Sequence, residues 1–489
     1  MIEKKLNLFN IKNIININNS VWRRKKMEDK LNLEVKNFGP INKAKIELGD
    51  INFKKNKKGK INIIAGKNAS GKSILSRLIY TSLASIGNDG EYTLNNYLNT
   101  SLLRIQRFLG DRFQTLTPSE IKQTHDTYKD KKFFNKLNDF YHKFKIFRFE
   151  PNNNKEYILE ELLQIEKLFN ENDYHPQTIE DEINKIKTKI EISKHPGKIR
   201  MEKFHLILME EFGEDIIKLI SSDNDCVNFY LHEKESLIQM GFEETTYSNQ
   251  EKIKIGDVYY IETPYILDFH KNQGFPSWYT GKFPLHHQNA LINKLKSDED
   301  YDWSFGSWNA DKVNNPKKLL NKIVDGNIKY KANDDVFKFT PNKGKEFNIT
   351  NTAAGIKIIG ILQLLLNKGL DDNSFIIMDE PEIHLHPDWQ IILAEAIIIL
   401  ARECQINFHI NTHSPQFVEA IDVYSRLYKM KTNTSFYLFE QIGNLDKYNL
   451  REIKQKHLVE IYDNLGKAYD KLDEIKGELF AKDIQESRN

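Results

Sequence analysis

The feature that most constrains this chain is a glycine-rich loop between an apolar run and a helix-like run. The loop follows the apolar residues 61–65 and precedes residues 74–83, which have the composition of a helix. Its sequence is Gly66-Lys67-Asn68-Ala69-Ser70-Gly71-Lys72-Ser73, with the spacing G-x-x-x-x-G-K-S. In a strand–loop–helix context, this spacing is typical of the phosphate-binding P-loop. The sequence therefore predicts an α/β fold of the P-loop NTPase type.

Each position of the loop has a physical role in holding a nucleotide. Gly66 and Gly71 can adopt backbone conformations that a side chain would forbid. The loop then points successive N–H groups at the phosphates, and the helix that follows adds the partial positive charge of its N-terminus. We expect Lys72 to reach the β- and γ-phosphates and the Ser73 hydroxyl to hold Mg²⁺. The predicted ligands are ATP and Mg²⁺, and the predicted nucleotide site extends through Ile74.

A second part of the site lies in the C-terminal half of the chain. The apolar run Ser374–Met378 ends in two acids, Asp379 and Glu380. In P-loop ATPases an acid at the first position binds Mg²⁺ directly or through water. The next acid, Glu380, is placed to polarise the attacking water as a general base. The unusual continuation Pro381–Pro387 favours this interpretation over that of an ordinary buried strand.

A histidine follows a further strand-like run. Residues Ile406–Asn411 lead directly into Thr412-His413-Ser414-Pro415. If this strand lies beside the strand that ends at Asp379, His413 is placed to sense the γ-phosphate. We therefore expect Lys72, Glu380 and His413 to carry the chemistry of hydrolysis.

Small residues precede a helical run over residues 358–366. They are Thr352, Ala353, Ala354 and Gly355, followed by Ile356 and Lys357. One interpretation is a simple helix cap. The other is a second anion-binding helix N-terminus, which points at a nucleotide held by another subunit. The residues alone leave both interpretations open.

Four segments, GKNASGKS, TAAGIK, MDEPEIHLHP and NTHSPQ, occur in this order along the chain. Together they resemble the ABC-type ATPases of the overcoming-lysogenization-defect (OLD) type. They look especially similar to the ATPase subunits of the PARIS and Septu anti-phage defence systems. The resemblance covers residues 27–85 and 255–420 and is weak between them. It implies a P-loop NTPase of ABC-ATPase type, a mixed sheet flanked by helices with an inserted helical lobe.

The resemblance also implies roles by position. Residues 66–73 correspond to Walker A, and Asp379-Glu380 to Walker B. Thr352–Lys357 corresponds to the signature loop, which acts across a dimer. Glu382–Pro387 corresponds to the D-loop region, and His413 to the switch histidine. In such ATPases two heads enclose two ATP molecules, and each P-loop faces the signature of the other protomer.

One residue departs from the family's pattern. The signature usually has a serine before its glycine, whereas this chain has Ala354 before Gly355. The backbone donor of Gly355 is kept, but one hydrogen bond to the γ-phosphate is lost. A charge-assisted hydrogen bond contributes about 1.5–3 kcal/mol. The departure predicts slow hydrolysis or a long-lived ATP-bound pair of heads.

Composition limits the partners of the chain. The 71 Lys and Arg residues nearly cancel the 69 Asp and Glu residues, so net charge predicts neither a nucleic-acid nor a membrane partner. Only two cysteines are present, which suits a reducing cytoplasm. The longest apolar stretches are too short for a membrane span. The histidines outside the motifs show no metal-ligand spacing, so a zinc site is not expected.

The 489 residues are enough for two or three domains, and the composition changes along the chain. Between the P-loop and the later motifs it becomes rich in Lys, Glu and Asn with helical periodicity. The expected segments are an extension over residues 1–26, an N-terminal head part over 27–91, an inserted helical lobe over 92–256, a C-terminal head part over 257–440 and a helical tail over 441–489.

The residues predict ATP chemistry, and only the resemblance predicts a biological role. It implies an ATP-hydrolysing sensor and scaffold of a bacterial anti-phage defence system, which holds a separate effector and releases or activates it. The tail lacks an acidic cluster long enough for a TOPRIM nuclease, and no HNH pattern is visible. The effector, a TOPRIM or HNH nuclease or a toxin, is therefore expected to be another polypeptide. The other expected partner is the chain itself, as a homodimer of heads or a larger homo-oligomer.

Two alternatives stay open. One is a DNA-repair or chromosome-associated ATPase that acts directly on DNA, and it predicts hydrolysis stimulated by DNA. The other is a self-contained ATPase-linked toxin that cleaves RNA, and it predicts toxicity from this gene alone. Nucleic acid thus remains open as a ligand.

Overall fold

The computed structural model describes most of the chain. The described residues are 30–50, 58–86, 98, 101–107, 136, 139, 155–171, 177–193, 195–213, 219, 227–231, 235–240, 245–247, 255–268, 286–296, 310–370 and 373–486. The chain divides into two units. The first comprises residues 1–87 and 201–489, and the second comprises residues 88–200. The predicted extension over residues 1–26 lies outside the described residues.

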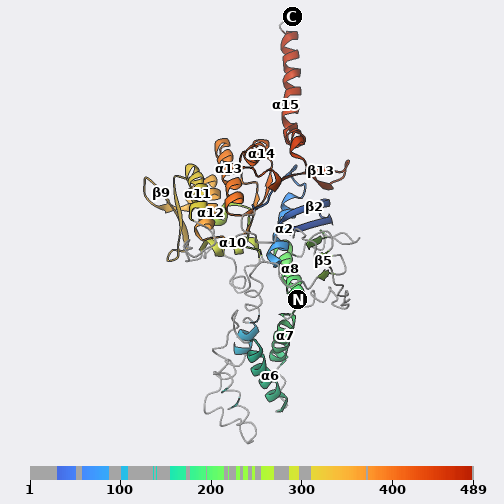
Figure 1. Ribbon diagram of the computed structural model, residues 1–489, viewed down its shortest axis with the longest axis vertical. Coiled ribbons are helices and arrows are strands. Elements are labelled where there is room, and N and C mark those ends of the chain that lie inside the picture. The colour runs from blue at the N-terminus through green and yellow to red at the C-terminus, as the bar shows by residue number, and fades with distance from the viewer. Residues whose placement is uncertain are drawn as a thin grey trace. The chain divides into compact units, whose positions relative to one another are not determined.

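A mixed sheet organises the first unit (Figure 1). Its described strands have the spatial order β6-β5-β4-β1-β2-β14-β13-β3-β12-β11-β7. Their bounds are β1 Lys30–Phe38, β2 Ile41–Asp50, β3 Ile61–Ala65, β4 Val227–Leu231, β5 Glu235–Met240, β6 Thr245–Tyr247, β7 Val258–Ile261, β11 Phe375–Asp379, β12 Asn407–Thr412, β13 Thr434–Gln441 and β14 Tyr448–Ile453.

The two halves of this sheet differ in strand direction. Strands β13, β3, β12, β11 and β7 pair in parallel, whereas β2, β1, β4, β5 and β6 form an antiparallel series. Every residue of β3 and β12 is buried. Parallel strands with helices on both faces need such continuous burial, and the apolar runs that suggested strands in the sequence reflect it.

Helices cover both faces of the parallel half. Along β11, Ile376 and Met378 join one core cluster, and Phe375 and Ile377 join the other, as the alternation of a strand requires. The helices against the first cluster are α10 His287–Lys296, α11 Ala310–Ile323, α12 Ala354–Asn367, α13 Pro387–Glu403 and α14 Pro415–Leu427. Against the second lie α2 Lys72–Ile86 and α8 Pro196–Phe212. This layered arrangement confirms the predicted fold class.

A small antiparallel sheet precedes α12. Its strands are β8 Gly326–Lys331, β9 Val336–Pro341 and β10 Phe347–Asn348, followed by the 3₁₀ turn η4 Ile349–Asn351. Helix α12 approaches β8 closely, because a Cβ added to Gly360 would lie 2.0 Å from Ile328 Cδ1. This contact packs the middle of α12 against β8.

The second unit contains two long described helices. They are α6 Lys155–Glu171 and α7 Gln177–Ser193, and they share a core with Leu98, Leu102 and Ile105. Ile158, Leu162 and Ile165 of α6 recur at helical spacing and are buried with Ile183 and Ile186 of α7. The helical periodicity of this part of the sequence therefore corresponds to real helices.

The C-terminal end of the predicted helical lobe differs from the structure. We expected the lobe to extend to residue 256, but residues 201–256 belong to the first unit. There β4 pairs with β1 and extends the large sheet through β5 and β6. Alternation of apolar residues in Val227–Leu231 is too short to stand out in a charged, mainly helical stretch.

The predicted helical tail also begins with a strand. Over residues 441–489 the chain first forms β14, which pairs antiparallel with β13 and parallel with β2. Only then, after the short turn η6 Gln455–His457, does it form the helix α15 Val459–Glu486. Another short turn, η5 Lys431–Asn433, precedes β13. Among the described residues, no helix combines the length and the apolar character that crossing a bilayer requires.

Candidate functional site

Three neighbouring parallel strands bring the predicted motifs to one edge of the sheet. Strand β12 lies between β3 and β11, and all three run in the same direction. The P-loop follows β3, Asp379 is the last residue of β11, and His413 follows β12. Because the carboxyl ends of parallel strands meet at one edge, segments far apart in sequence converge there.

The P-loop has the backbone that its glycines allow. Gly71 has φ +100, and a Cβ there would lie 2.8 Å from Ile41 Cγ1. A Cβ at Gly66 would lie 2.8 Å from Phe439 Cβ. Both positions therefore exclude side chains by contact, and Gly71 does so by conformation as well. Ala69, with φ 60, also takes the left-handed conformation within the loop.

Lys72 begins helix α2 and folds back over the loop. Its side chain is 5% exposed, and its Nζ donates to the carbonyls of Gly66 and Lys67, each at 3.1 Å. The same Nζ lies 2.6 Å from His413 Nε2 and 3.9 Å from Glu380 Oε1. Burial lowers the pKa of Lys72, while the charges of the nearby acids oppose that shift.

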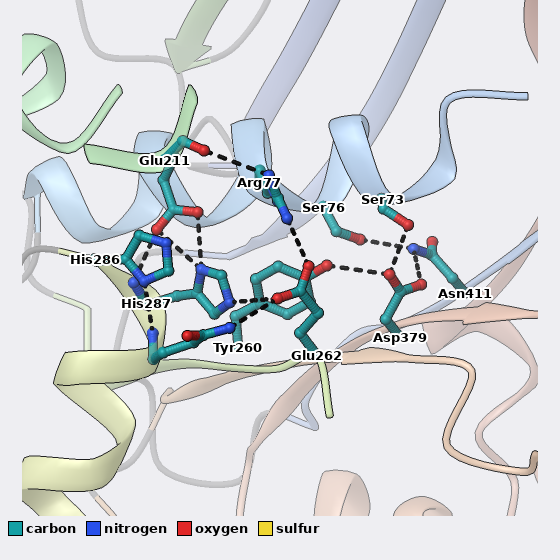
Figure 2. Close-up of polar contacts among 11 residues, drawn as sticks. Ser73, Ser76, Arg77, Glu211, Tyr260, Glu262, His286, His287, Asp379 and Asn411 are labelled. Atoms are coloured by element: carbon teal, nitrogen blue, oxygen red, sulfur yellow. Dashed lines mark hydrogen bonds and ion pairs between the residues drawn. The ribbon is translucent and has the colours of Figure 1, made fainter. Parts of the chain in front are cut away.

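Ser73 and Asp379 form the candidate magnesium site (Figure 2). Ser73 Oγ donates to Asp379 Oδ2 at 2.6 Å. Asn411 Nδ2 donates to the other carboxylate oxygen at 2.7 Å and to Ser76 Oγ at 2.9 Å. Tyr260 OH donates to Asp379 Oδ2 at 3.1 Å. A hydroxyl and a carboxylate held together at a strand end fit Mg²⁺, which prefers oxygen ligands.

Glu380 lies beside the histidine that was expected to sense phosphate. Its Oε1 is 2.9 Å from His413 Nε2, and its backbone has the uncommon φ of 48. Burial raises the pKa of Glu380. The charge of Lys72 opposes this shift, and the charge of Asp379 adds to it. A raised pKa suits a group that must accept a proton.

His413 is neutral at pH 7 in this arrangement. Burial, together with the charge of Lys72, lowers the pKa of His413 to about 4. Its contact with Glu380 is therefore a hydrogen bond and not an ion pair. The single Nε2 atom faces two groups, and it accepts from Lys72 in one tautomer or donates to Glu380 in the other. His413 can thus exchange one partner for the other.

A buried acid joins the segment after β11 to the segment after β12. Glu382 Oε1 accepts from Thr412 Oγ1 at 2.6 Å and from the backbone N–H of His413 at 2.9 Å. Burial raises the pKa of Glu382, and these two donors oppose the shift. The sequence placed Glu382 only in a D-loop region, and the structure shows that it positions His413.

The predicted signature residues lie at the start of α12. Ala353 is the N-cap and makes no side-chain cap bond, so the first N–H groups of the helix are not capped by a side chain. A Cβ at Gly355 would lie 2.6 Å from the carbonyl oxygen of His384. Lys357 is buried and donates to both carboxylate oxygens of Asp268, at 2.8 and 2.7 Å. In the part of the chain that the structure describes, these contacts join the signature to the D-loop region and to Asp268. They do not join it to the P-loop.

Comparison with protein families decides the class of this chain. Residues 31–418 match the AAA ATPase domain family. The chain belongs to this family. It is an ATPase with a P-loop NTPase fold, and the mixed sheet with helices on both faces agrees with that assignment.

Solved structures similar to this ATPase include heads of SMC proteins. One is an SMC head bound to the C-winged helix domain of ScpA, with 11% identity, TM-score 0.33, and coverage of 88% of this chain and 99% of that one. Another is the SMC head domain from Thermotoga maritima, with 9% identity, TM-score 0.33 and coverage of 87% and 99%. A third is the Pyrococcus furiosus Smc head with an extended coiled coil, bound to the C-terminal domain of ScpA, with 12% identity, TM-score 0.29 and coverage of 92% and 100%. None of the curated proteins matches the chain.

A second polar cluster of the ATPase lies next to the candidate magnesium site (Figure 2). At its centre the fully buried His287 places Nδ1 2.7 Å from Glu211 Oε2 and Nε2 3.2 Å from Glu262 Oε2. Glu262 also accepts from Arg77 Nη2 at 2.6 Å. The ring of Tyr260 packs against His287, with centroids 4.4 Å apart, and so links this cluster to Asp379.

The charges within this cluster reinforce one another. Burial alone would lower the pKa of His287, but its hydrogen bonds with Glu211 and Glu262 outweigh burial and raise it. The hydrogen bond from His287 lowers the pKa of Glu262 well below its usual range, although burial opposes this shift. The hydrogen bond and the charge of Arg77 lower the pKa of Glu262 further. The surroundings of His287 therefore favour its imidazolium form, which can donate to both carboxylates.

An alternative interpretation is that part of this cluster binds a metal ion. Ligand atoms of Glu211, His286 and His287 lie within 4.8 Å of one another. However, each ring nitrogen of His287 already faces a carboxylate at a hydrogen-bond distance. A proton on each nitrogen, donated to the carboxylate, explains these distances without a metal ion. The ion-pair interpretation is therefore the better one. No sequence spacing marked the whole cluster, because Arg77, Glu211, Glu262 and His287 come from four separate segments.

Proposed function

We propose that this ATPase is the sensor and scaffold of a bacterial anti-phage defence system of the OLD type. In this proposal it holds a separate nuclease or toxin and releases or activates it according to its nucleotide state. The observation that supports the nucleotide part is the convergence of Lys72, Glu380 and His413 beside the Ser73–Asp379 pair. The defence role rests on the resemblance of the four segments around these residues.

The chain's own residues divide the work of hydrolysis. Ser73 and Asp379 would hold Mg²⁺, which supplies charge neutralisation at the phosphates when bound. Lys72 binds the phosphates, and for that its amine leaves His413 Nε2. The freed Nε2 then gains a proton from water while Nδ1 releases one to water, so the ring stays neutral and donates to Glu380. His413 thus reports whether Lys72 is engaged. Glu380 orients the attacking water and accepts its proton.

Two heads complete the site in this proposal. The uncapped start of α12, at Ala353–Gly355, would meet the nucleotide of a second copy through its backbone N–H groups. Ala354 provides no hydroxyl for the γ-phosphate. The paired state is therefore expected to be long-lived and the turnover slow.

The end of helix α8, Pro196–Phe212, is bound to the P-loop helix α2 within the first unit. Near its end, the backbone carbonyl of Glu211 accepts from Arg77 on the P-loop helix α2, and its carboxylate binds His287. A shift of α2 on nucleotide binding would therefore act directly on α8.

Co-purification with neighbouring genes tests the role. The tagged wild type and Glu380→Gln are each expressed with the adjacent genes, and Glu419→Gln, an exposed acid on α14, is the matched control. We expect a stoichiometric nuclease or toxin whose retention differs between wild type and Glu380→Gln but not between wild type and the control. A homo-oligomer that carries DNA and no protein partner would overturn the scaffold role and favour direct action on DNA.

A further inference from the structure

Helix α15 is labelled near the C-terminus in Figure 1. Its sequence carries an apolar stripe with a regular repeat that begins at Leu458, the residue just before the helix. A leucine occurs at every seventh residue, at 458, 465, 472 and 479, and isoleucines occur at 461 and 475 between them. In the heptad notation the leucines occupy the a positions and the isoleucines occupy d positions. Such a stripe is the seam of a coiled coil.

The two halves of this stripe have different surroundings. Leu458 and Ile461 are 4% and 0% exposed and belong to the core of the first unit, and Leu465 packs against that core. Leu472 and Leu479 are 51% and 53% exposed. Ile475 between them is 43% exposed. Among the described residues, nothing covers this second half, although it continues the same seam.

Charges beside the exposed seam select its partner and direction. Lys471 and Glu478 occupy g positions, and Lys476 occupies an e position. In a parallel pair of these helices, g faces e of the partner, so Lys471 would meet Lys476 twice. In an antiparallel pair, g faces g, so Lys471 would meet Glu478 twice. Each of these three side chains is exposed, and Asp473, which pairs with Lys476 at 2.8 Å, lies on the outer face.

We propose that the exposed half of α15 binds the same segment of a second copy of this chain as an antiparallel coiled coil. Leu472 of one helix then shares a layer with Ile475 of the other, and two Lys471–Glu478 pairs flank these layers. The contact is separate from any pairing of the heads around ATP, and it does not depend on the proposed function.

Sedimentation equilibrium of the full-length chain without nucleotide tests the proposal. We expect the wild type to self-associate, and Leu472→Glu to raise the dissociation constant about tenfold or more, because it puts a charge into the seam. Asp473→Asn, on the outer face, is the matched control and should change little. A wild type that stays monomeric, or a Leu472→Glu variant that associates like the wild type, would overturn the proposal.

Charge reversal tests the direction of the helices. Lys471→Glu and Glu478→Lys should each weaken association several-fold, and the double variant should restore it, because the reversed charges again face each other. In a parallel pair, by contrast, Lys471→Glu would face Lys476 and tighten association. Tightening by Lys471→Glu, or failure of the double variant to restore association, would contradict the antiparallel arrangement. Circular dichroism of each variant separates these effects from loss of the helix.

Discussion

Two histidines lie at the same edge of the sheet, and their environments differ in an informative way. His413 faces Lys72 and one carboxylate, and its pKa is lowered to about 4. His287 lies between two carboxylates, and its pKa is raised although it is more deeply buried. Burial pushes both rings toward the neutral form, so the charges of the partners decide the outcome.

This difference separates a ring with two competing partners from a ring whose two nitrogens are both engaged. His413 has one nitrogen and two competing partners, so a change at Lys72 changes what the ring does. Both nitrogens of His287 are engaged with Glu211 and Glu262, so any displacement of this ring separates buried charges. We interpret the first as the switch of the ATP site and the second as its rigid support.

The largest expected effect is at the acid beside the switch. Glu380→Gln should lower the rate of ATP hydrolysis about 10²–10⁴-fold, because the amide cannot accept the proton of the attacking water. ATP binding should be retained, since Lys72 and Ser73 are unchanged. Steady-state hydrolysis and equilibrium binding of ATP measure the two quantities. Hydrolysis near the wild-type rate would remove Glu380 from the proposed chemistry.

Alanine substitutions at the two histidines should separate stability from catalysis. His287→Ala leaves two partly or fully buried carboxylates without their shared cation, and should lower the free energy of unfolding by about 3–5 kcal/mol. His413→Ala should change stability much less and slow hydrolysis instead. His286→Ala is the neighbouring control, and urea denaturation with an ATPase assay gives both readouts. Equal losses of stability for His413 and His287 would contradict the distinction.

A smaller effect is expected where the two clusters are joined. Tyr260→Phe removes the hydroxyl that donates to Asp379, while the donors Ser73 and Asn411 remain. The loss should be about 1.5 kcal/mol, or roughly tenfold in the Mg²⁺ concentration for half-maximal hydrolysis. A magnesium titration of the ATPase rate measures it. An unchanged Mg²⁺ requirement would show that Tyr260 does not position Asp379.

The smallest expected effects are the contributions of His287 and His413 to the free energy of unfolding, which change in opposite directions with pH. The folded pKa of His287 is raised above 6.5, so its stabilisation is complete below pH 6.5 and is lost as pH rises through the folded value. The pKa of His413 is lowered, so its contribution is complete above pH 6.5 and declines toward pH 4. Urea denaturation across this range should show that His287→Ala removes the loss at high pH and leaves the loss at low pH. The reverse pattern would contradict these protonation states.

The sequence marked the residues around Lys72, but it did not mark the cluster around His287. Glu380 and His413 each follow directly after a buried strand, and Lys72 follows β3 through the P-loop, so the parallel pairing of these strands brings the three motifs together. His287, Glu211 and Glu262 come from separate segments with no fixed spacing, so only the folded chain reveals their contact.

The same contrast applies to the fold. The buried parallel strands β3 and β11 are mainly apolar, and β12 alternates apolar and polar residues before the Thr412–Pro415 motif, so all three were expected. In contrast, β4–β6 at the far edge of the sheet are short and lie in a charged stretch. Strand β14 was also missed, because half of its residues are charged or amide side chains, and its position depends on pairing with β2 and β13.

The central claim is that one chain holds the catalytic residues and a second chain completes the site through its signature. Mixing two inactive variants tests it most directly. Lys72→Ala disables the P-loop and keeps the signature. Ala354→Glu disables the signature and keeps the P-loop. The Ala354→Glu substitution is preferred to a change at Gly355, because any Cβ at Gly355 would lie 2.6 Å from the carbonyl oxygen of His384.

Each variant alone should hydrolyse ATP at a negligible rate. An equimolar mixture should recover about a quarter of the wild-type rate, because half of the pairs are mixed and each mixed pair has one intact site of two. Recovery at that level would support the paired-head account. No recovery, or full activity of Ala354→Glu alone, would contradict it.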